Sequence, residues 1–167
     1  MIRIESRHFG TLEVEEGKIL RFPRGLVGFA DATSFCLLSH LEAAPYQWLQ
    51  GVTRPDLAFI VVPMAFIDPA YQLDLGETER QILRLNPGEQ PLVLGIVTIP
   101  EDPLDAMVNK LAPLVLNENT RLGHQVINES SGYRTRHVIR EELGPRAREG
   151  ENHVGAYPQE KAVIDAR

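Results

Sequence analysis

The sequence predicts an all-β, mainly antiparallel fold, namely a small closed or nearly closed β-barrel-like domain with one or two short helices. Three observations lead to this fold class. About eight or nine short runs rich in Val, Ile, Leu and aromatic residues follow one another, and glycine or proline stands between them. Two of these runs are continuously apolar, which is typical of strands covered on both faces. Only one segment has the periodicity of a helix.

The most apolar run, residues 55–67, is the stretch around which the rest of the chain is organised. Its centre, residues 57–62, is expected to form a core strand, because side chains branched at Cβ pack well on a pleated sheet. Pro63 has no N–H to donate to a neighbouring strand, so it should mark a strand end, an edge or a bulge.

The N-terminal part of the chain should form three strands and a fixed loop. Residues 1–14 alternate apolar and charged side chains on either side of a turn at 8–10, which is typical of a hairpin. A short third strand is expected at 18–22. Two glycines and a proline then predict a tight loop at 22–29, whose aromatic ends plug the core.

Two further strands are expected before the core strand, over residues 35–38 and 46–52. Cys36 lies in the first of them and should be a small buried residue rather than a reactive thiol. Trp48 lies in the second and should anchor the core rather than serve as a ligand platform.

The strongest helix signal follows the core strand. Asp74 and Glu77 have the spacing of a capping box, and the Leu and Ile residues behind them fall on one side of a helix. An Asn-Pro-Gly sequence at residues 86–88 should end this helix, because proline and glycine both oppose its continuation.

Three more strands should complete the barrel, over residues 92–99, 111–116 and 121–127. Gly95 inside the first of them predicts a bulge or a bend, as at a barrel corner. A rigid acidic loop should follow at 100–103.

The character of the sequence changes near residue 140, where Glu, Arg, Gly, Pro and Ala become dominant. Such a segment buries too little apolar surface to offset the entropy lost on ordering. We therefore predict a barrel domain over residues 1–139 and a mobile, at most loosely helical, tail over residues 140–167.

The chain has 167 residues, 43% of them hydrophobic, and a formal net charge of −6. A domain of this length buries about 70% of its unfolded surface, so it needs neither a disulfide nor a metal to fold. The single cysteine excludes an internal disulfide and suits the reducing cytoplasm. The first residues are charged, and no run approaches the ~20 apolar residues of a membrane span, so we expect neither a signal peptide nor membrane binding.

Residues 1–139 hold most of the acidity, with 17 Asp and Glu against 12 Lys and Arg. This balance argues against direct nucleic-acid binding, which depends on neutralising phosphates with Lys and Arg. It permits a basic protein partner, steered by opposite charge. Residues 133–137 form the one basic segment with an aromatic residue. This segment is either a small RNA-contacting patch or, as we prefer, an arginine pair that balances the acidic body.

No catalytic or metal-binding motif occurs in the sequence. There is no Gly-x-Ser-x-Gly elbow, no Gly-rich phosphate loop and no dinucleotide fingerprint. The five histidines lack the spacing of metal ligands on a helix. We therefore expect no enzyme, no cofactor and no metal. The remaining enzymatic alternative is a hydrolase site assembled in space around His124 or His137.

A series of motifs resembles the FliW flagellar assembly factors. It begins with Phe-Pro-x-Gly-Leu-x-Gly-Phe and ends with Tyr-x-Thr-Arg-His, in collinear order over roughly residues 1–139. The motifs stand at residues 22–29, 45–52, 55–62, 97–103, 109–117, 123–127 and 133–137. Each motif alone is weak, whereas the series is specific. The segment after residue 140 departs from the family pattern.

The resemblance implies a monomeric β-barrel-like protein of the bacterial cytoplasm without enzymatic activity. It also implies two alternative protein partners, flagellin and the RNA-binding translational repressor CsrA. Family members antagonise CsrA and thereby relieve its repression of flagellin synthesis once flagellin has been exported. The alternative is a β-barrel binding module for another protein or for RNA.

Acidic loop residues are the candidates for contacting the basic repressor. They are Asp68, Asp74, Glu77, Glu101, Asp102 and Asp105. The competing interpretation is that several of them only cap turns, Asp74 above all. We expect the 22–29 motif to be structural, since its glycines and aromatic residues fit loop geometry and core packing.

Overall fold

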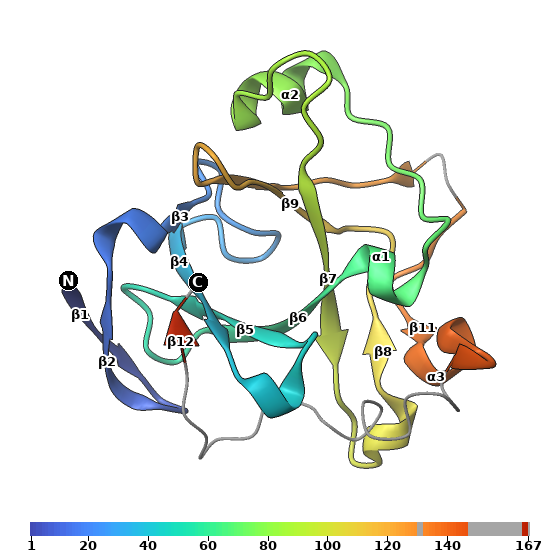
Figure 1. The fold of residues 1–167 in the computed structure, drawn as a ribbon, viewed down its shortest axis with the longest axis horizontal. Helices are drawn as coiled ribbons and strands as arrows, with labels where there is room; N and C mark the ends of the chain where they lie inside the picture. The colour runs from blue at the N-terminus through green and yellow to red at the C-terminus, as the bar shows by residue number, and fades with distance from the viewer. Residues whose placement is uncertain (130–131, 147–164, 167) are drawn as a thin grey trace.

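Seven strands close into a barrel in the computed structural model, which describes residues 1–129 and 132–146 and the backbone of 165–166 (Figure 1). The strand order is β7–β6–β5–β4–β3–β10–β9, and β9 pairs with β7 to complete the ring. The pairs are antiparallel except for β3 and β10, which run parallel. The barrel strands are β3 (Leu20–Arg21), β4 (Ser34–Ser39), β5 (Gln47–Gly51), β6 (Ala58–Pro63), β7 (Leu92–Thr98), β9 (Leu114–Asn117) and β10 (Leu122–Gln125). The predicted closed, mainly antiparallel barrel is therefore confirmed.

The other described strands lie outside the ring. A separate hairpin joins β1 (Ile2–Ser6) to β2 (Gly10–Val14), as predicted. Two short strands, β8 (Met107–Val108) and β11 (His137–Val138), extend the sheet from one end of β7. A last short strand, β12 (Asp165–Ala166), pairs with β4.

Three short α-helices and three 3-10 turns connect the described strands. The helices are α1 (Met64–Ile67), α2 (Glu77–Leu83) and α3 (Ile139–Leu143), and the turns are η1 (Glu16–Lys18), η2 (Leu41–Ala43) and η3 (Pro103–Asp105). The predicted helix is α2, and the structure adds the one-turn helices α1 and α3. The predicted capping box is wrong, because the N-cap of α2 is Gly76 and no side chain caps it. Asp74 lies two residues too early to do so.

The core strand β6 is covered on both faces, as its continuous apolar sequence predicts. Val61 belongs to the cluster inside the barrel, where it meets side chains such as Leu94 and Leu116. Val62 belongs to a second cluster, which α1 and α3 build on the outer face of the barrel wall. Pro63 is the last residue of β6, so the predicted strand end is confirmed.

The loop over residues 22–29 is structural. Phe22 is fully buried and contacts Phe35 edge-to-face, with ring centroids 5.4 Å apart, while Phe29 packs in the same way on Phe59 at 5.6 Å. Gly25 has a φ of +64°, and a Cβ there would lie 2.5 Å from the carbonyl oxygen of Phe29. Only glycine fits this turn, so the motif serves the geometry of the loop.

The β1–β2 hairpin covers a third apolar cluster on the outer face of β4 and β5. Cys36 is fully buried there, and burial raises the pKa of its thiol to about 12. Trp48 packs between His8 and Phe9, with centroid distances of 4.9 and 5.4 Å. Both residues therefore have the packing roles that the sequence predicts.

Packed structure continues past the predicted domain boundary at residue 139. Ile139 and Leu143 are buried on the inner side of α3. Arg146 then donates to the carbonyl oxygens of Phe66 and Ile67 at 2.9 and 2.8 Å. Two aliphatic residues one helical turn apart thus dock this polar segment beyond the predicted domain boundary. The prediction of a mobile tail otherwise falls on residues outside the described part of the chain.

Candidate protein-binding surfaces

The described residues present no metal site and no membrane-spanning helix. No group of three or more His, Cys, Asp and Glu side chains among them gathers closely enough to hold a metal ion. None of the helices in this part of the chain is both long and apolar enough to span a bilayer. The acidic residues predicted from the sequence are the candidates for contacting a protein partner.

The two histidines of the hydrolase alternative lie in different surroundings. His124 lies half-buried on β10, where burial and the nearby Arg24 lower the pKa of its imidazole. His137 uses both ring nitrogens, since Nε2 accepts from the N–H of Arg134 at 2.9 Å and Nδ1 lies 2.8 Å from Glu142 Oε1. The first contact requires an unprotonated Nε2, so Nδ1 carries the proton that it donates to Glu142.

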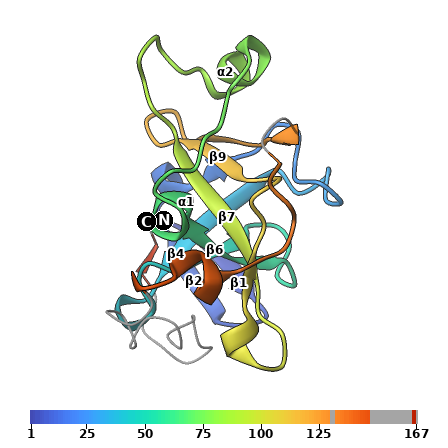
Figure 2. The same cartoon turned by 90° about the vertical axis from the view of Figure 1, so that its right-hand side faces the viewer.

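The six predicted acidic residues do not form one surface. Asp74 and Glu77 lie beside and on α2, at one end of the barrel, whereas Glu101, Asp102 and Asp105 lie on the loop that follows β7 and carries η3 (Figure 1). Figure 2 shows the same two positions at opposite ends of the molecule. Asp68 belongs to neither group.

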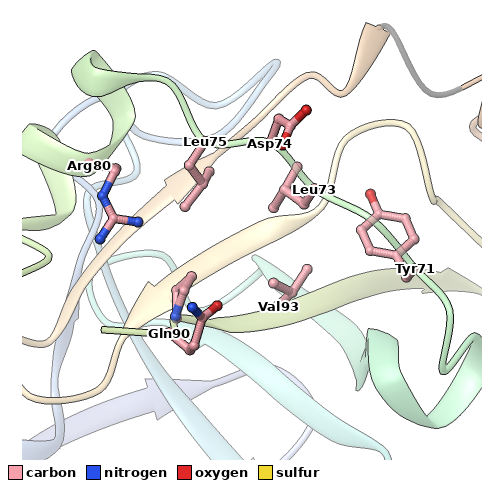
Figure 3. Close-up of a pocket in the computed structure, with 8 residues that line it drawn as sticks. Tyr71, Leu73, Asp74, Leu75, Arg80, Gln90 and Val93 are labelled. Carbon is pink, nitrogen blue, oxygen red and sulfur yellow. The ribbon is translucent and has the colours of Figure 1, made fainter. Parts of the chain in front are cut away.

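At the α2 end, an open cavity of about 380 Å³ lies between the segment that leads into α2 and the start of β7. Leu73, Leu75 and Arg80 face Gln90 and Val93 across it (Figure 3). The carboxylate of Asp74 points away from the opposite wall in this view, although the residue belongs to the lining.

Hydrogen bonds fix the geometry of this end. Arg80 Nη2 donates to the carbonyl oxygen of Asn86 at 2.8 Å and thereby closes the turn after α2. The N–H of Asn86 and the side chain of Asn119 both donate to Glu89 and lower the pKa of its carboxyl. Arg80 and Glu89 thus hold the turn after α2 in place. Asp74 and Glu77 are the two predicted acidic residues at this end, and both are exposed.

At the opposite end, the acidic loop is held in one shape while its carboxylates face solvent. Asp102 Oδ1 accepts from the N–H of Leu104 at 3.0 Å and caps η3. Asp105 pairs with Arg140 of α3 at 3.0 Å. Glu101 is exposed, and the side chain of Leu104 is 50% exposed between these carboxylates. The exposed surface of this loop therefore combines one apolar residue, Leu104, with the carboxylates of Glu101, Asp102 and Asp105.

Asp68 differs from the other five candidates, because its carboxylate is bound inside the protein. Asp68 Oδ2 lies 2.9 Å from Lys110 Nζ, and the Lys110 residue is only 4% exposed. Burial raises the pKa of the Asp68 carboxyl, but the hydrogen bond and charge of Lys110 lower it by more, so the net shift is downward. This geometry favours a structural role for Asp68.

Lys110 is the centre of a polar cluster that the sequence analysis missed. Its ammonium group also contacts Glu142 Oε2 at 2.9 Å and lies 4.7 Å from the ring centroid of Tyr133. Burial lowers the pKa of Lys110, while its hydrogen bonds to Asp68 and Glu142 raise it by more. The ion pairs thus keep a buried lysine charged.

The same cluster joins segments that are far apart in the sequence. Tyr71 stacks on Tyr133 with centroids 4.7 Å apart, and its hydroxyl donates to the carbonyl oxygen of Lys110 at 2.7 Å. Arg134 and Arg136 of the predicted basic segment are exposed. In the sequence, Lys110 and Tyr133 were marked only because they lie in the family motifs at residues 109–117 and 133–137.

Comparison with known proteins places the whole barrel in one group. A sequence model described as FliW protein matches residues 3–139. A flagellar assembly factor FliW of Natranaerobius thermophilus is 34% identical over 148 residues, which cover 88% of this chain and 98% of the relative. One of Desulfitobacterium hafniense is 41% identical over 139 residues, covering 83% and 91%.

A solved structure agrees with the sequence relatives. The crystal structure of the flagellar assembly factor FliW superposes with a TM-score of 0.77 at 32% identity and covers 83% of this chain and 96% of its own. All six acidic candidates lie within the matched residues 3–139, whereas most of α3, with Glu142, lies outside them.

Proposed function

The chain belongs to the FliW family of flagellar assembly factors, and from this premise we propose that it is a non-catalytic, protein-binding regulator of flagellin synthesis. It binds flagellin and, alternatively, the translational repressor CsrA, and it antagonises CsrA by binding it. It acts in the cytoplasm and is a monomer when free.

The acidic loop at η3 is the observation that carries this proposal. An RNA-binding repressor must present Lys and Arg to phosphates, so a negatively charged loop is complementary to it. Glu101 and Asp102 are exposed, and the η3 turn holds them in place. Leu104 adds an exposed apolar side chain beside these carboxylates, which a bound partner would cover.

The molecule has room for two partners. A stable interface covers about 800 Å² on each partner, and the accessible surface of this protein is 9486 Å². The two acidic groups lie at opposite ends of the barrel (Figure 2). The repressor is assigned to the η3 end, because Glu101, Asp102 and the exposed Leu104 lie together there.

Charge reversal at the η3 end tests the proposal. The double substitution Glu101→Lys and Asp102→Lys should weaken binding to purified CsrA at least about tenfold and flatten its dependence on salt. The matched control reverses Asp74 and Glu77 at the α2 end and should leave CsrA binding within about twofold. Isothermal titration at two salt concentrations measures both.

Loss of charge must be separated from loss of the η3 cap. Asp102→Asn keeps an oxygen that accepts from the N–H of Leu104 while removing the charge. Combined with Glu101→Gln, it should weaken CsrA binding in the same direction as charge reversal. If both double variants bind CsrA with unchanged affinity, this loop is not part of the CsrA-binding surface. Direct RNA binding in a filter assay without CsrA would instead favour a nucleic-acid module.

A further inference from the structure

Four arginines lie along β10 and the turn that precedes it, and we call them the arginine stripe. They are Arg21, Arg24, Arg84 and Arg121. Arg21 of β3 pairs with Leu122 of β10, and its N–H donates to the carbonyl oxygen of Arg121 at 2.8 Å. These two arginines are therefore neighbours across the parallel pair of the barrel.

The other two members join the stripe on either side of this pair. Asn117 Nδ2 donates to the carbonyl oxygen of Arg84 at 3.3 Å, and the carbonyl oxygen of Asn117 accepts from the N–H of Arg121 at 2.9 Å. Burial and then the positive charge of Arg24 lower the pKa of His124 on β10, so Arg24 lies close to that strand. The stripe thus runs from the C-terminal end of α2 to the middle of β10.

The four guanidinium groups are not used inside the protein. Within the described part of the chain, none of them forms an ion pair or a side-chain hydrogen bond, whereas Arg3, Arg54 and Arg140 pair with carboxylates. Arg121 is half-buried and the other three members are exposed. These charges are therefore available to a partner.

The surroundings of the stripe are positive, although the protein as a whole is acidic. Residues 21–30 and 117–127 hold three arginines and one glutamate, in a chain with a net charge of −6. Glu79 of α2, which acts on His124 from the other side, is a further acidic neighbour. The four arginines thus outnumber the two carboxylates beside them.

Two members hold a backbone conformation that arginine rarely adopts. Arg84 and Arg121 have φ angles of +51° and +60°, and they are the non-glycine residues with positive φ in the described part of the chain. Arg84 is the C-cap of α2 and Arg121 ends the β9–β10 turn, where glycine or asparagine is favoured. Both side chains are retained at a conformational cost that no described contact explains.

Two exposed apolar side chains continue the surface beyond the arginines. Val27 is 68% exposed and Ile127 is 45% exposed. The N–H of Val27 donates to Gln125 Oε1 at 2.8 Å, which places the loop beside the end of β10, two residues before Ile127. An extended chain spans about 20 Å between residues 121 and 127. The surface thus changes from charged to apolar over the length of about six extended residues.

We propose that the arginine stripe, with Val27 and Ile127, is a docking surface for an acidic segment of a partner protein that carries an apolar residue at one end. Guanidinium groups bind carboxylates in a bidentate manner, and arginine is enriched in protein interfaces. The apolar pair fixes the direction in which the segment lies. Its charge is opposite to that of the basic repressor assigned to the η3 loop, so this is a separate surface.

Single-stranded nucleic acid fits this surface less well than an acidic protein segment. Binding of single strands combines positive charge with aromatic side chains on which bases stack, and none of these six residues is aromatic. The acidic body also repels a polyphosphate. We therefore assign the stripe to a protein partner.

Titration with a synthetic peptide tests where the acidic segment binds. The probe has two leucines followed by six glutamates, and a control peptide has glutamine at the six positions. In nitrogen–proton correlation spectra, the glutamate peptide should shift amides over residues 21–27 and 121–127 and leave residues 101–105 unchanged. The glutamine peptide should bind at least about tenfold more weakly. No shift at the stripe, or equal binding of both peptides, overturns the proposal.

Paired asparagine variants separate binding from folding. Arg84→Asn with Arg121→Asn removes two charges, while asparagine suits a positive φ, so the melting temperature should not fall. Fluorescence anisotropy should show at least about fivefold weaker binding of the glutamate peptide. The control Arg134→Asn with Arg136→Asn changes the net charge equally outside the stripe and should keep the affinity within about twofold.

Three results of these measurements would overturn the proposal. Equal weakening in both pairs would show an effect of net charge alone. A lower melting temperature of the stripe variant would show that its arginines serve the fold. Tighter binding of an eight-residue oligouridine than of the glutamate peptide would assign the surface to nucleic acid. No measurement here uses CsrA or flagellin, so the proposed function is tested separately.

Discussion

Lys110 shows what a single residue contributes to this fold. A buried ammonium group is costly unless it is paired, and here two carboxylates and an aromatic face surround it. Its partners come from the segment after α1, from the loop before β11 and from α3. Lys110 therefore ties the C-terminal packed segment to the barrel.

Replacing Lys110 with Met should destabilise the protein by roughly 3 kcal/mol, because Asp68 and Glu142 are left without their cation. Urea unfolding followed by tryptophan fluorescence measures this, since Trp48 is the single tryptophan. Glu142→Gln should also destabilise, whereas the control Glu141→Gln lies on the exposed side of α3 and should change stability by less than about 0.5 kcal/mol. A Lys110→Met protein as stable as that control contradicts this role.

Asp68 gives this cluster a dependence on pH. Its folded pKa lies below the ordinary value of 3.8, so its stabilising contribution is present above that value and is lost as pH falls through the folded pKa. Asp68→Asn should therefore be less stable than wild type at pH 7 and should lose less stability between pH 5 and 3. Parallel stability curves for the two proteins would contradict the assignment.

Among the elements, the barrel strands, the β1–β2 hairpin and α2 were predictable, whereas the short strands β8 and β11 and the one-turn helices α1 and α3 were not. Continuous apolar runs predict β6 and β7, and the alternation of apolar with polar residues predicts the β1–β2 hairpin. α1 directly follows the apolar run of β6, and α3 lies in a charged stretch. One helical turn is too short for a hydrophobic period to reveal, so tertiary packing alone defines them.

The contact between β10 and the 22–29 loop depends on a missing side chain. A Cβ at Gly123 would lie 2.4 Å from Phe22 Cζ, in the middle of the core. Gly123→Ala should therefore lower stability by about 1–3 kcal/mol through overpacking. The control Gly17→Ala meets nothing within 4 Å and should be nearly neutral. Thermal unfolding compares them, and equal melting temperatures would show that the loop yields without cost.

At the scale of the whole molecule, the sequence predicts which acidic residues are candidates for partner contact but not where they lie relative to one another. Asp74 and Glu77 lie at the start of α2 and residues 101–105 lie on the η3 loop, and barrel closure places these two groups at opposite ends. Asp68 is also removed from the surface by Lys110, a contact between residues 42 positions apart. Such long-range pairing has no local signature, so sequence reasoning could not foresee it.

The proposed alternation of partners can be measured, because two separated ends leave room for a ternary complex that alternation forbids. If flagellin and CsrA are bound in turn, adding purified flagellin to the complex with CsrA should release CsrA. Size-exclusion chromatography with mass measurement should then show two binary species and no ternary one. A complex that contains all three proteins would show that the two ends act independently.

The seam of the barrel joins early and late parts of the chain, because β10 completes the ring by pairing with β3 and β9. A nascent chain still on the ribosome cannot form this seam until residue 125 has emerged. Until then β3 lacks its outer neighbour and exposes an edge of the kind that promotes aggregation. Fragments released before that point are therefore natural clients for chaperones and proteases, and translation itself sets when the ring can shut.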